Sequence, residues 1–512
     1  MSNLTFKSTR TEFLSAIERF DVAPVHAVIE SPSVRPIDAL RSLRIPGEPA
    51  FIFESKSPEA GASRYAYVCP AIESVVRTGE SEALGDINPI SALRSHFDTR
   101  TVAPIDELPY LITGVFGFVA YEAIKHFEPS VGDLHDDPTD SPVSAFISSR
   151  ELLVFDRALD QLHVILFARS THEFDPAMER ISQICHILES TQPDDLTPTA
   201  SQTDIQPEAI STKCQYADMV RKARKAIIEG ELIQVVLGQR VEIETAADPI
   251  DIYERLSTLN PSPYMYMLDL GDMQLIGTSP ELMLRSTGGL AAMHPIAGTR
   301  SRGITAEDDL QNEADLLSNE KESAEHVMLV DLARNDLGRV CKPGTVKVTS
   351  LKHIERYSHV MHLVSRVEGQ LTGDRDGIDA FQAGFPIGTL SGAPKIRSIQ
   401  LITELEPEGR GPYCGAIGLF APNGDVDTGT IIRSVVLRNG TAHIQGGAGI
   451  VFDSDPDAEN LESLQKAKAP LLAIARAEVM TTRNVHHRHH RRSNEQISPN
   501  SPLTATILIS GD

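Results

Sequence analysis

Apolar residues recur with two different periods along the chain. Between residues 49 and 170 short apolar runs dominate, such as FIFES at 51–55 and RYAYV at 64–68, which predicts antiparallel strands and hairpins. At 174–190 and 216–232 the apolar residues are instead spaced as on one face of a helix. The pattern therefore predicts a β-rich part followed by helices.

The last third of the chain carries clear turn and cap signals. Asn-Gly pairs at 423–424 and 439–440 separate β-rich runs, which predicts hairpin turns in a meander over 411–451. Ser454-Asp455-Pro456 is typical of a helix start, with the helix continuing through Ala467. Another helix is expected from about 308 to 337, ended by Gly338.

Composition shifts suggest the boundaries of three parts. The segment 191–210 is rich in Pro, Asp, Ser and Thr, and apolar periodicity is lost after about Thr481. We predict an N-terminal β-rich part at 20–190, a larger part at 211–480, and a disordered tail at 481–512 that includes a His/Arg cluster.

Composition excludes several classes of protein. The 512 residues carry a net charge of −24, which disfavours binding to nucleic acid. Apolar stretches fall far short of the roughly 18 residues of a membrane span, and the first residues do not resemble a secretory signal. The five cysteines are scattered without a C-x-x-C pair, which argues against disulfides or structural zinc. We expect a cytoplasmic protein with no membrane partner.

Acidic residues share faces on two of the predicted helices. Glu322 and Glu325 are three residues apart, and Glu459, Glu462 and Lys466 have helical spacing too. Two facing pairs of carboxylates suit a hard cation such as Mg²⁺ together with an anionic substrate. The alternative is a pair of solvated faces supported by Glu–Lys contacts.

Glycine-rich segments lie beside these helices. GGAG at 446–449 precedes the second helix, and GTLSGAPK at 388–395 precedes another helix start. Such loops let backbone N–H groups approach an anion, and Arg433 has the fork that a carboxylate prefers. The alternative is that they are tight turns. No phosphate loop, dinucleotide fingerprint or Ser/His/Asp arrangement is present.

Several long motifs occur in a fixed order: TSPELMLR, HPIAGTRSRG, NEKESAEHVMLVDLARNDLGRV, ERYSHVMHLVSRVEG, FPIGTLSGAPK and GGAGIV. Over about 216–475 the chain closely resembles the chorismate-utilising enzymes, and among them the aminase subunits that form anthranilate. The resemblance implies an α/β (α+β) fold in which two antiparallel sheets form a sandwich with outer helices, and in which N-terminal and C-terminal portions interlock. Gly238 departs from the family pattern, where serine is commoner.

The resemblance also implies a site. Chorismate would bind with Mg²⁺ bridging its ring carboxylate to the helix glutamates, Glu325 and Glu462 approaching closest. Glu281 would be the general acid, His362 the base or its orienter, and Thr299 a substrate-positioning residue. The magnesium residues are Glu322, Glu325, Glu459 and Glu462, and the residues around the enolpyruvyl carboxylate are Tyr413, Arg433, Gly446, Gly447, Gly449 and Lys466.

Two positions discriminate among the family's reactions. Relatives that add water carry a lysine base where this chain has Gln234, and a neutral amide cannot deprotonate water. Aminodeoxychorismate synthases carry lysine where this chain has Ala297. Both point to amination beside the ring carboxylate and, after pyruvate elimination, to anthranilate. An aminodeoxyisochorismate synthase of phenazine type, an aminodeoxychorismate synthase and an inactive regulator are the alternatives.

A partner and a regulator are implied as well. Cys414 lies in the hairpin that the resemblance assigns to substrate binding, so we expect ammonia from a separate glutamine amidotransferase subunit, anthranilate synthase component II. Tryptophan is the expected feedback inhibitor, the alternative being that 51–55 is simply a core strand. The inhibitor residues would be Glu54, Ser55, Asn260, Pro263, Met265 and Tyr266.

Overall fold

The structure is a computed structural model that describes residues 4–54, 64–191, 212–357 and 360–490, with the backbone alone described at 212–214 and 480–490. Ser55, one of the predicted inhibitor residues, lies outside the described residues. No helix of the described chain is long and apolar enough to cross a membrane.

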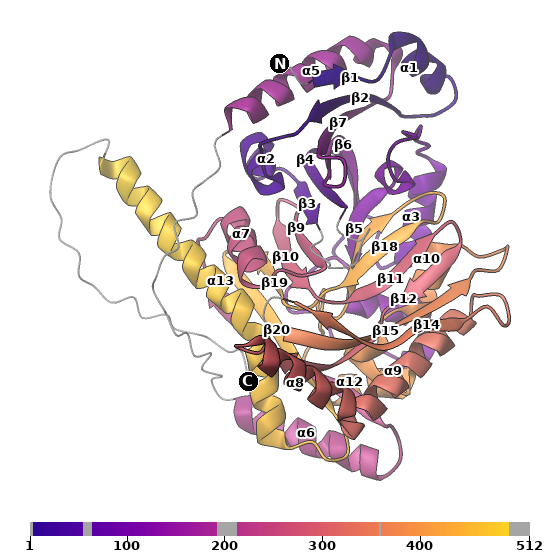
Figure 1. The fold of residues 1–512 in the computed structure, drawn as a ribbon, viewed down its shortest axis with the longest axis vertical. Helices are drawn as coiled ribbons and strands as arrows, with labels where there is room; N and C mark the ends of the chain where they lie inside the picture. The colour runs from indigo at the N-terminus through magenta and orange to yellow at the C-terminus, as the bar shows by residue number, and fades with distance from the viewer. Residues whose placement is uncertain (1–3, 55–63, 192–211, 358–359, 491–512) are drawn as a thin grey trace.

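Antiparallel strand pairs form one connected sheet that forks at β6 (Ser144–Asp156). The first branch runs through β4 (Tyr65–Thr78), β3 (Ala50–Glu54), β9 (Tyr264–Asp269), β10 (Met273–Ser279), β19 (Ser434–Arg438), β20 (Thr441–Ile450), β8 (Gln234–Glu244) and β16 (Gly392–Ala393). The second runs through β5 (Val115–Val119), β17 (Ala416–Phe420), β18 (Val426–Thr430), β11 (Leu282–Thr287), β12 (Leu290–Met293) and β15 (Val360–Gln370), which is flanked by β13 (Ile296–Ser301) and β14 (Lys347–Arg356). The strands β7 (Gln161–Ala168), β2 (Ala23–Glu30) and β1 (Leu4–Phe6) continue from β6 at the N-terminal end (Figure 1).

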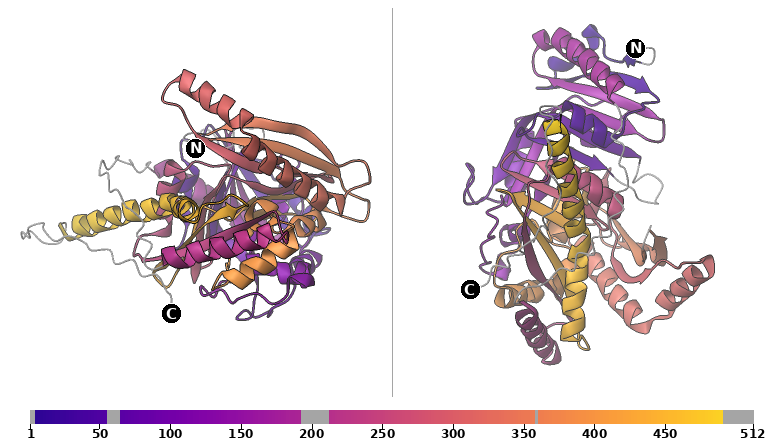
Figure 2. Two further views of the ribbon diagram at one scale, coloured as in Figure 1. Left: turned by 90° about the horizontal axis from the view of Figure 1, so that it is seen from below. Right: turned by 90° about the vertical axis from the view of Figure 1, so that its left-hand side faces the viewer.

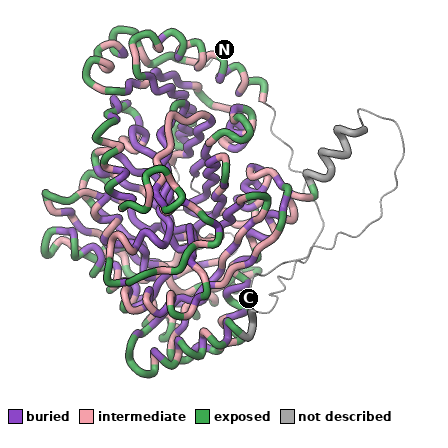
Figure 3. The backbone as a smooth tube through the Cα atoms, turned by 180° about the vertical axis from the view of Figure 1, so that it is seen from behind, coloured by how far each residue is buried: buried purple, intermediate pink, exposed green. Residues whose placement is uncertain are grey.

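The two branches face each other across a core of large side chains. Phe116 of β5 lies with its ring centroid 4.4 Å from that of Phe51 and 5.0 Å from that of Phe53, both on β3. These side chains are buried in one hydrophobic cluster, and Figure 3 shows that most of the buried backbone lies in the strands of the middle of the molecule. The predicted sandwich of antiparallel sheets with outer helices is confirmed, and it is not a closed barrel.

Helices cover the outer faces of both branches (Figures 1 and 2). On the first lie α2 (Pro36–Leu43), α7 (Pro249–Leu259) and α13 (Pro456–His490), with α6 (Thr212–Ile228) and α12 (Lys395–Leu405) packed on β8. The helices α1 (Arg10–Ile17) and α5 (Phe174–Ser190) instead pack on β2 and β7 at the N-terminal end. On the second lie α3 (Pro89–Asp98), α9 (Glu320–Gly338) and α10 (Gly377–Gly384). The helix α8 (Ala306–Ser318) packs on β13 and contacts α9. Shorter elements are α4 (Ile124–Phe127), α11 (Gly388–Ser391), η1 (Tyr110–Thr113), η2 (Tyr121–Ala123), η3 (Pro129–Val131) and η4 (Thr171–Glu173).

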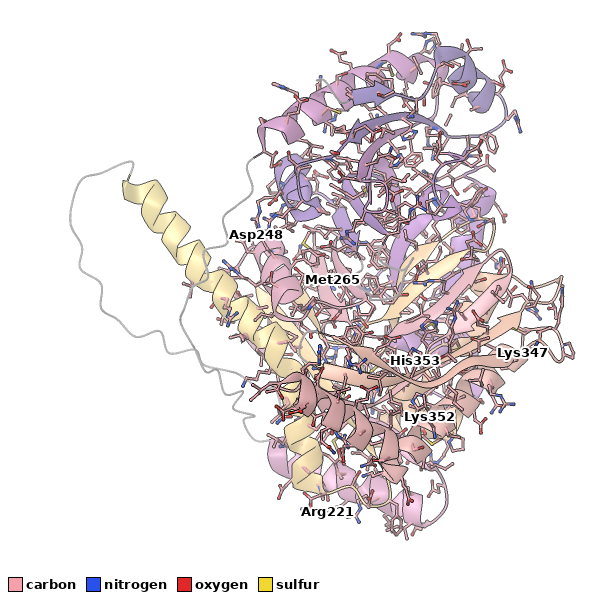
Figure 4. All side chains as sticks on the ribbon, in the orientation of Figure 1. Arg221, Asp248, Met265, Lys347, Lys352 and His353 are labelled. Carbon is pink, nitrogen blue, oxygen red and sulfur yellow. The ribbon has the colours of Figure 1, made fainter. Side chains whose placement is uncertain are left out.

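N-terminal strands pair directly with strands from the rest of the chain. β3 pairs with β9, and β5 pairs with β17, so each branch contains strands from both halves of the sequence. Figure 4 shows Met265, on β9, in this interlocked middle of the molecule. The N-terminal portion is therefore joined to the rest by sheet hydrogen bonds.

The helix expected at 308–337 is two helices, which corrects the prediction. Asn319 has an extended backbone between α8 and α9, and its side-chain oxygen accepts a hydrogen bond from the backbone N–H of Glu322 at 3.0 Å. A short amide that satisfies a free N–H favours a helix start over a helix interior. At the other end of the chain, α13 continues to His490, ten residues beyond Met480, into the segment predicted to be a tail.

The expected meander over 411–451 is two separate hairpins. The turns at Asn423-Gly424 and Asn439-Gly440 join β17 to β18 and β19 to β20, as predicted. However, β18 belongs to the second branch and β19 to the first. The chain crosses between branches at 431–433, where Arg433 takes a left-handed backbone with φ of 53°. This crossing could not be read from alternation alone, because the strands on both sides of it are almost wholly buried.

Candidate active site

A cavity of about 700 Å³ lies between α9, α13 and the strands β8, β13 and β20. Its wall contains all the residues predicted for catalysis, magnesium and the enolpyruvyl carboxylate. They are Gln234, Glu281, Ala297, Thr299, Glu322, Glu325, His362, Tyr413, Arg433, Gly446, Gly447, Gly449, Glu459, Glu462 and Lys466.

Two crossings between the branches meet at this cavity. The chain passes from β10 to β11 through Glu281, and from β18 to β19 through Arg433. The backbone N–H of Thr430 donates to the carbonyl of Glu281 at 3.0 Å, so the two crossings are bonded to each other. Both side chains reach the cavity because each leaves the sheet where regular pairing stops.

Glu281 is a buried carboxyl group that tends to keep its proton. Its side chain is 4% exposed, and one carboxyl oxygen accepts a hydrogen bond from the Thr389 hydroxyl at 2.6 Å. Burial raises the pKa of Glu281 to about 8, although the bond from Thr389 lowers it. A carboxyl group with this pKa can donate a proton at neutral pH.

His362 and Thr299 face each other across the pair β13–β15. Their register places Thr299 opposite His362, and the Thr299 hydroxyl lies 2.9 Å from Nδ1 of the histidine. Burial lowers the pKa of His362 to about 4, with a further lowering by the charge of Arg433. The imidazole is therefore neutral near pH 7 and can accept a proton.

Gln234 offers a free acceptor in the cavity wall. Its side chain is 8% exposed, and Oε1 is buried without a hydrogen-bond partner among the described residues. A Cβ on Gly449 would lie 2.9 Å from Nε2 of Gln234, so glycine is needed to leave this amide in place. An acceptor that lacks a donor in a polar cavity is a place for a small hydrogen-bonding ligand.

The glycines of 446–449 allow other parts of the chain to pack closely on β20. A Cβ on Gly446 would collide with the carbonyl oxygen of Ser463, and one on Gly447 would lie 2.9 Å from the Tyr413 hydroxyl. Lys466 donates from Nζ to the carbonyl of Gly447 at 2.8 Å. Ser463 and Tyr413 therefore leave room for no side chain larger than that of glycine at positions 446 and 447.

The four glutamates differ in their partners. Glu322 pairs with Arg300 at 3.0 Å and Glu462 with Lys466 at 2.7 Å. Glu325 and Glu459 have no ion pair within 4 Å in the part of the chain that is described. Burial is the largest cause of the raised pKa of each, and neighbouring carboxylates add to it, while the charge of Lys321 acts in the opposite direction. Repulsion between these groups would be relieved by a cation.

The donor set tests whether Mg²⁺ fits. Glu322, Glu325, Glu459 and Glu462 offer only carboxylate oxygens, the ligands that Mg²⁺ prefers. Among the described residues no three acidic, His or Cys side chains are close enough to hold an ion by themselves. Mg²⁺ usually keeps several water or substrate oxygens, so the wall fits a magnesium ion that a bound anion helps to hold.

The predicted inhibitor residues lie in the interlocked strands. Glu54 is paired in register with Met265, and its carboxylate accepts hydrogen bonds from Tyr253 at 2.7 Å and Arg157 at 2.6 Å. Asn260 donates to the Thr278 hydroxyl at 3.0 Å. Pro263 and Tyr266 are buried in the same region. The described part of 51–55 is also a core strand, as the alternative held.

Sequence reasoning missed several residues of the site. Thr389 and Lys321 lie in family motifs but were given no role, and Gln445 lines the cavity without any recognisable spacing. Arg410 and Glu406 lie behind the wall, and the only signal for them was a charged pair four residues apart.

Comparison with known proteins identifies the fold and the family. The family described as chorismate binding enzyme matches residues 48–472. Anthranilate synthase component 1 of Streptomyces coelicolor is 43% identical over 468 residues, 90% of each chain, and that of Mycolicibacterium smegmatis is 38% identical over 92% of this chain and 94% of its own.

Solved structures agree with this assignment. Anthranilate synthase component I from Streptococcus pneumoniae superposes with a TM-score of 0.71 at 35% identity, over 80% of this chain and 93% of the other. The menaquinone-specific isochorismate synthase of Escherichia coli shares the fold, with a TM-score of 0.67 at 19% identity over 91% of this chain and 98% of the other. The chain belongs to the family of chorismate binding enzymes.

Proposed function

We propose that this enzyme converts chorismate and ammonia to anthranilate and pyruvate, the first step of tryptophan biosynthesis. One observation carries the proposal: the cavity places a carboxyl group that stays protonated, Glu281, in the same wall as a neutral amide with a free acceptor, Gln234. The relatives named anthranilate synthase component 1 support the same reaction.

The amination uses both groups. Oε1 of Gln234 accepts a hydrogen bond from ammonia and orients its lone pair toward C2 of the ring, which needs no base because ammonia is already a nucleophile. The C2–N bond forms as both conjugated ring double bonds shift and the C4–O bond breaks. Glu281 protonates the departing 4-hydroxyl, which leaves as water, and the product is aminodeoxyisochorismate.

The elimination uses the neutral histidine. His362, held by Thr299, accepts the C2 proton directly or orients the group that does, the C2–H electron pair forms the C2–C3 double bond, and the C3–O bond breaks. The enolpyruvate that leaves takes up a proton at its methylene carbon and becomes pyruvate. The ring becomes aromatic. Arg433 and Tyr413 hold the enolpyruvyl carboxylate, with the amides of 446–449 beside them.

A magnesium ion held by the glutamates of α9 and α13 would neutralise the ring carboxylate and polarise it. The pairing pattern supports Glu325 and Glu459 as the carboxylates most in need of a cation, whereas Glu462 already has Lys466. Lys321, paired with Asp453 at 3.1 Å, lies at the same side of the cavity.

Ammonia is proposed to come from a separate glutamine amidotransferase subunit. A glutaminase needs an activated thiol, but Cys414 is buried and burial raises the pKa of its thiol to about 12. The described cysteines Cys69, Cys185, Cys341 and Cys414 are free thiols, in keeping with the cytoplasmic location that we propose.

Tryptophan is proposed to inhibit the enzyme at the interlocked strands. Glu54, already held by Tyr253 and Arg157, would meet the amino group of tryptophan, with Asn260, Pro263, Met265 and Tyr266 around it. If Glu54→Gln were inhibited by tryptophan as strongly as the unchanged enzyme, this part of the proposal would be wrong.

The test is to incubate the purified chain with chorismate, Mg²⁺ and ammonium chloride and to identify products by fluorescence and mass. Anthranilate and pyruvate, formed from ammonium but not from glutamine, are the expected result. Gln234→Leu should raise the KM for ammonium more than that for chorismate. Accumulated aminodeoxyisochorismate would instead favour the phenazine-type reaction, and a para-aminated product would favour an aminodeoxychorismate synthase.

A further inference from the structure

Arg410 is a buried cation directly behind the active-site wall. It lies between α12 and β17, is 2% exposed, and pairs with Glu406 at 2.6 Å. A buried charge is tolerated only where its hydrogen-bonding groups are satisfied. The hydrogen-bond acceptors of Arg410 therefore indicate which parts of the fold it connects.

Its partners belong to the cavity wall. Nη1 donates to the carbonyl of Leu390 at 3.0 Å, and Nη2 donates to that of Val236 at 2.7 Å. The carbonyl of Arg410 itself accepts from Nε2 of Gln445 at 2.7 Å. Leu390, Val236 and Gln445 all line the cavity, on three elements that are far apart in the sequence.

Arg410 also acts on Tyr413, the proposed ligand of the enolpyruvyl carboxylate. Its guanidinium carbon lies 5.8 Å from the centroid of the Tyr413 ring and 4.8 Å from that of Tyr121. Burial raises the pKa of the Tyr413 phenol, and the charge of Arg410 acts in the opposite direction. A cation beside the ring makes the phenol a better donor to an anion.

Glu406 extends this network to the glycine strand. Its Oε1 accepts from the backbone N–H of Gly238 at 2.6 Å as well as from Arg410. Gly238 is the register partner of Gly447 across β8–β20, and Gly447 accepts from Lys466. A Cβ at Gly238 would lie 3.2 Å from the Tyr413 ring and 3.4 Å from Glu406. Glycine at this position therefore allows Tyr413 and Glu406 to approach the strand closely.

We propose that Arg410, held by Glu406, is the positioning residue that sets the affinity for the substrate's enolpyruvyl carboxylate. It fixes the wall elements that bear Val236, Leu390 and Gln445 relative to Tyr413. The inference rests on the proposed function for the identity of the ligand. It does not require Arg410 to touch chorismate.

The test compares Arg410→Lys with Arg100→Lys. Lysine keeps the charge but cannot supply a planar fork to two carbonyls and a carboxylate at once. Arg100 is the matched control, since it is 4% exposed, pairs with Glu73 at 2.7 Å, and is absent from the cavity wall. For each protein the Kd for chorismate is measured by calorimetry and the Tm by thermal unfolding. The kcat and the KM for chorismate are measured with ammonium as the nitrogen source.

The expected result is a split between binding and turnover. In Arg410→Lys the Kd and KM for chorismate should rise about tenfold while kcat stays within about threefold, because an interaction made equally in ground and transition states is lost. Arg100→Lys should lower Tm but leave Kd unchanged. Unchanged binding in Arg410→Lys, or an equal loss in both variants, would overturn the proposal.

A second variant covers a failure of the first to fold. Glu406→Gln keeps the shape of the side chain and its bond from Gly238 but removes the charge that orients Arg410. Its Kd should rise at least threefold, and an unchanged Kd would overturn the inference. If the unchanged enzyme binds chorismate but forms no anthranilate, the proposed function fails while the comparison of Kd values still decides the role of Arg410. If it does not bind chorismate, both fail.

Discussion

Replacing Glu281 by glutamine removes the proton that the proposed amination delivers to the departing hydroxyl. The pKa of Glu281 is raised to about 8 by burial, so most molecules hold this proton at neutral pH. General acid catalysis typically contributes 10²–10⁴-fold, so we expect kcat to fall about a thousandfold in Glu281→Gln. The Kd for chorismate should change little, because the amide has the same shape.

The same pKa has a consequence for stability. The group titrates near 4.5 when unfolded and near 8 when folded, so the folded chain binds more protons between these values. The free energy of unfolding should therefore fall as pH rises through this interval, by about 1.4 kcal/mol per pH unit and roughly 5 kcal/mol in all. Glu281→Gln lacks this loss, so it should be more stable than the unchanged enzyme at pH 8 and equally stable below pH 4.5.

The assay follows anthranilate fluorescence from pH 6.5 to 9.5, with each rate divided by the concentration of unprotonated ammonia. The unchanged enzyme should lose activity with a midpoint near the pKa of Glu281, about 8. Thr389→Val removes the hydrogen bond that lowers this pKa, so its midpoint should move to higher pH. An alkaline loss that persists in Glu281→Gln, or full activity of that variant, would refute the assignment.

Three further predictions follow from the same cavity. Gly446→Ala should reduce kcat at least a hundredfold and lower Tm, because its Cβ would collide with a carbonyl of α13. The control Gly373→Ala has open space around the new Cβ, so its kcat and Tm should equal those of the unchanged enzyme. Burial lowers the pKa of His362 to about 4, so the rate divided by the concentration of unprotonated ammonia should not fall as the pH is lowered from 7 to 5. A fall with a midpoint near pH 6.5 that disappears in His362→Gln would contradict this. With chorismate present, Mg²⁺ should raise Tm because it relieves repulsion around Glu325 and Glu459, and an equal rise in the variant with glutamine at both positions would argue against the site.

The sequence predicts best those features that depend on neighbours along the chain. The Asn439-Gly440 turn forms as expected because Asn439 and Gly440 both have positive φ, of 52° and 79°, which that pair tolerates. The break of the helix at Asn319 was missed, because helical spacing continues on both sides and only the cap hydrogen bond marks the end. Alternation likewise gave no warning that β18 and β19 belong to different branches, since each strand is buried in its own branch.

The site shows the same division at a larger scale. Residues proposed to touch the substrate, such as Glu281 and Thr299, stand in motifs that are recognisable because their chemistry demands one residue type at one place. Arg410 has no such signature. Its partners are carbonyls of residues 20 and 174 positions away, which any amino acid would supply, so no pattern of side chains records the contact. A residue that acts through hydrogen bonds to backbone carbonyls can be recognised only in the folded structure, where those carbonyls lie close together. Its substitution therefore tests how the cavity wall is positioned and leaves the catalytic groups unchanged.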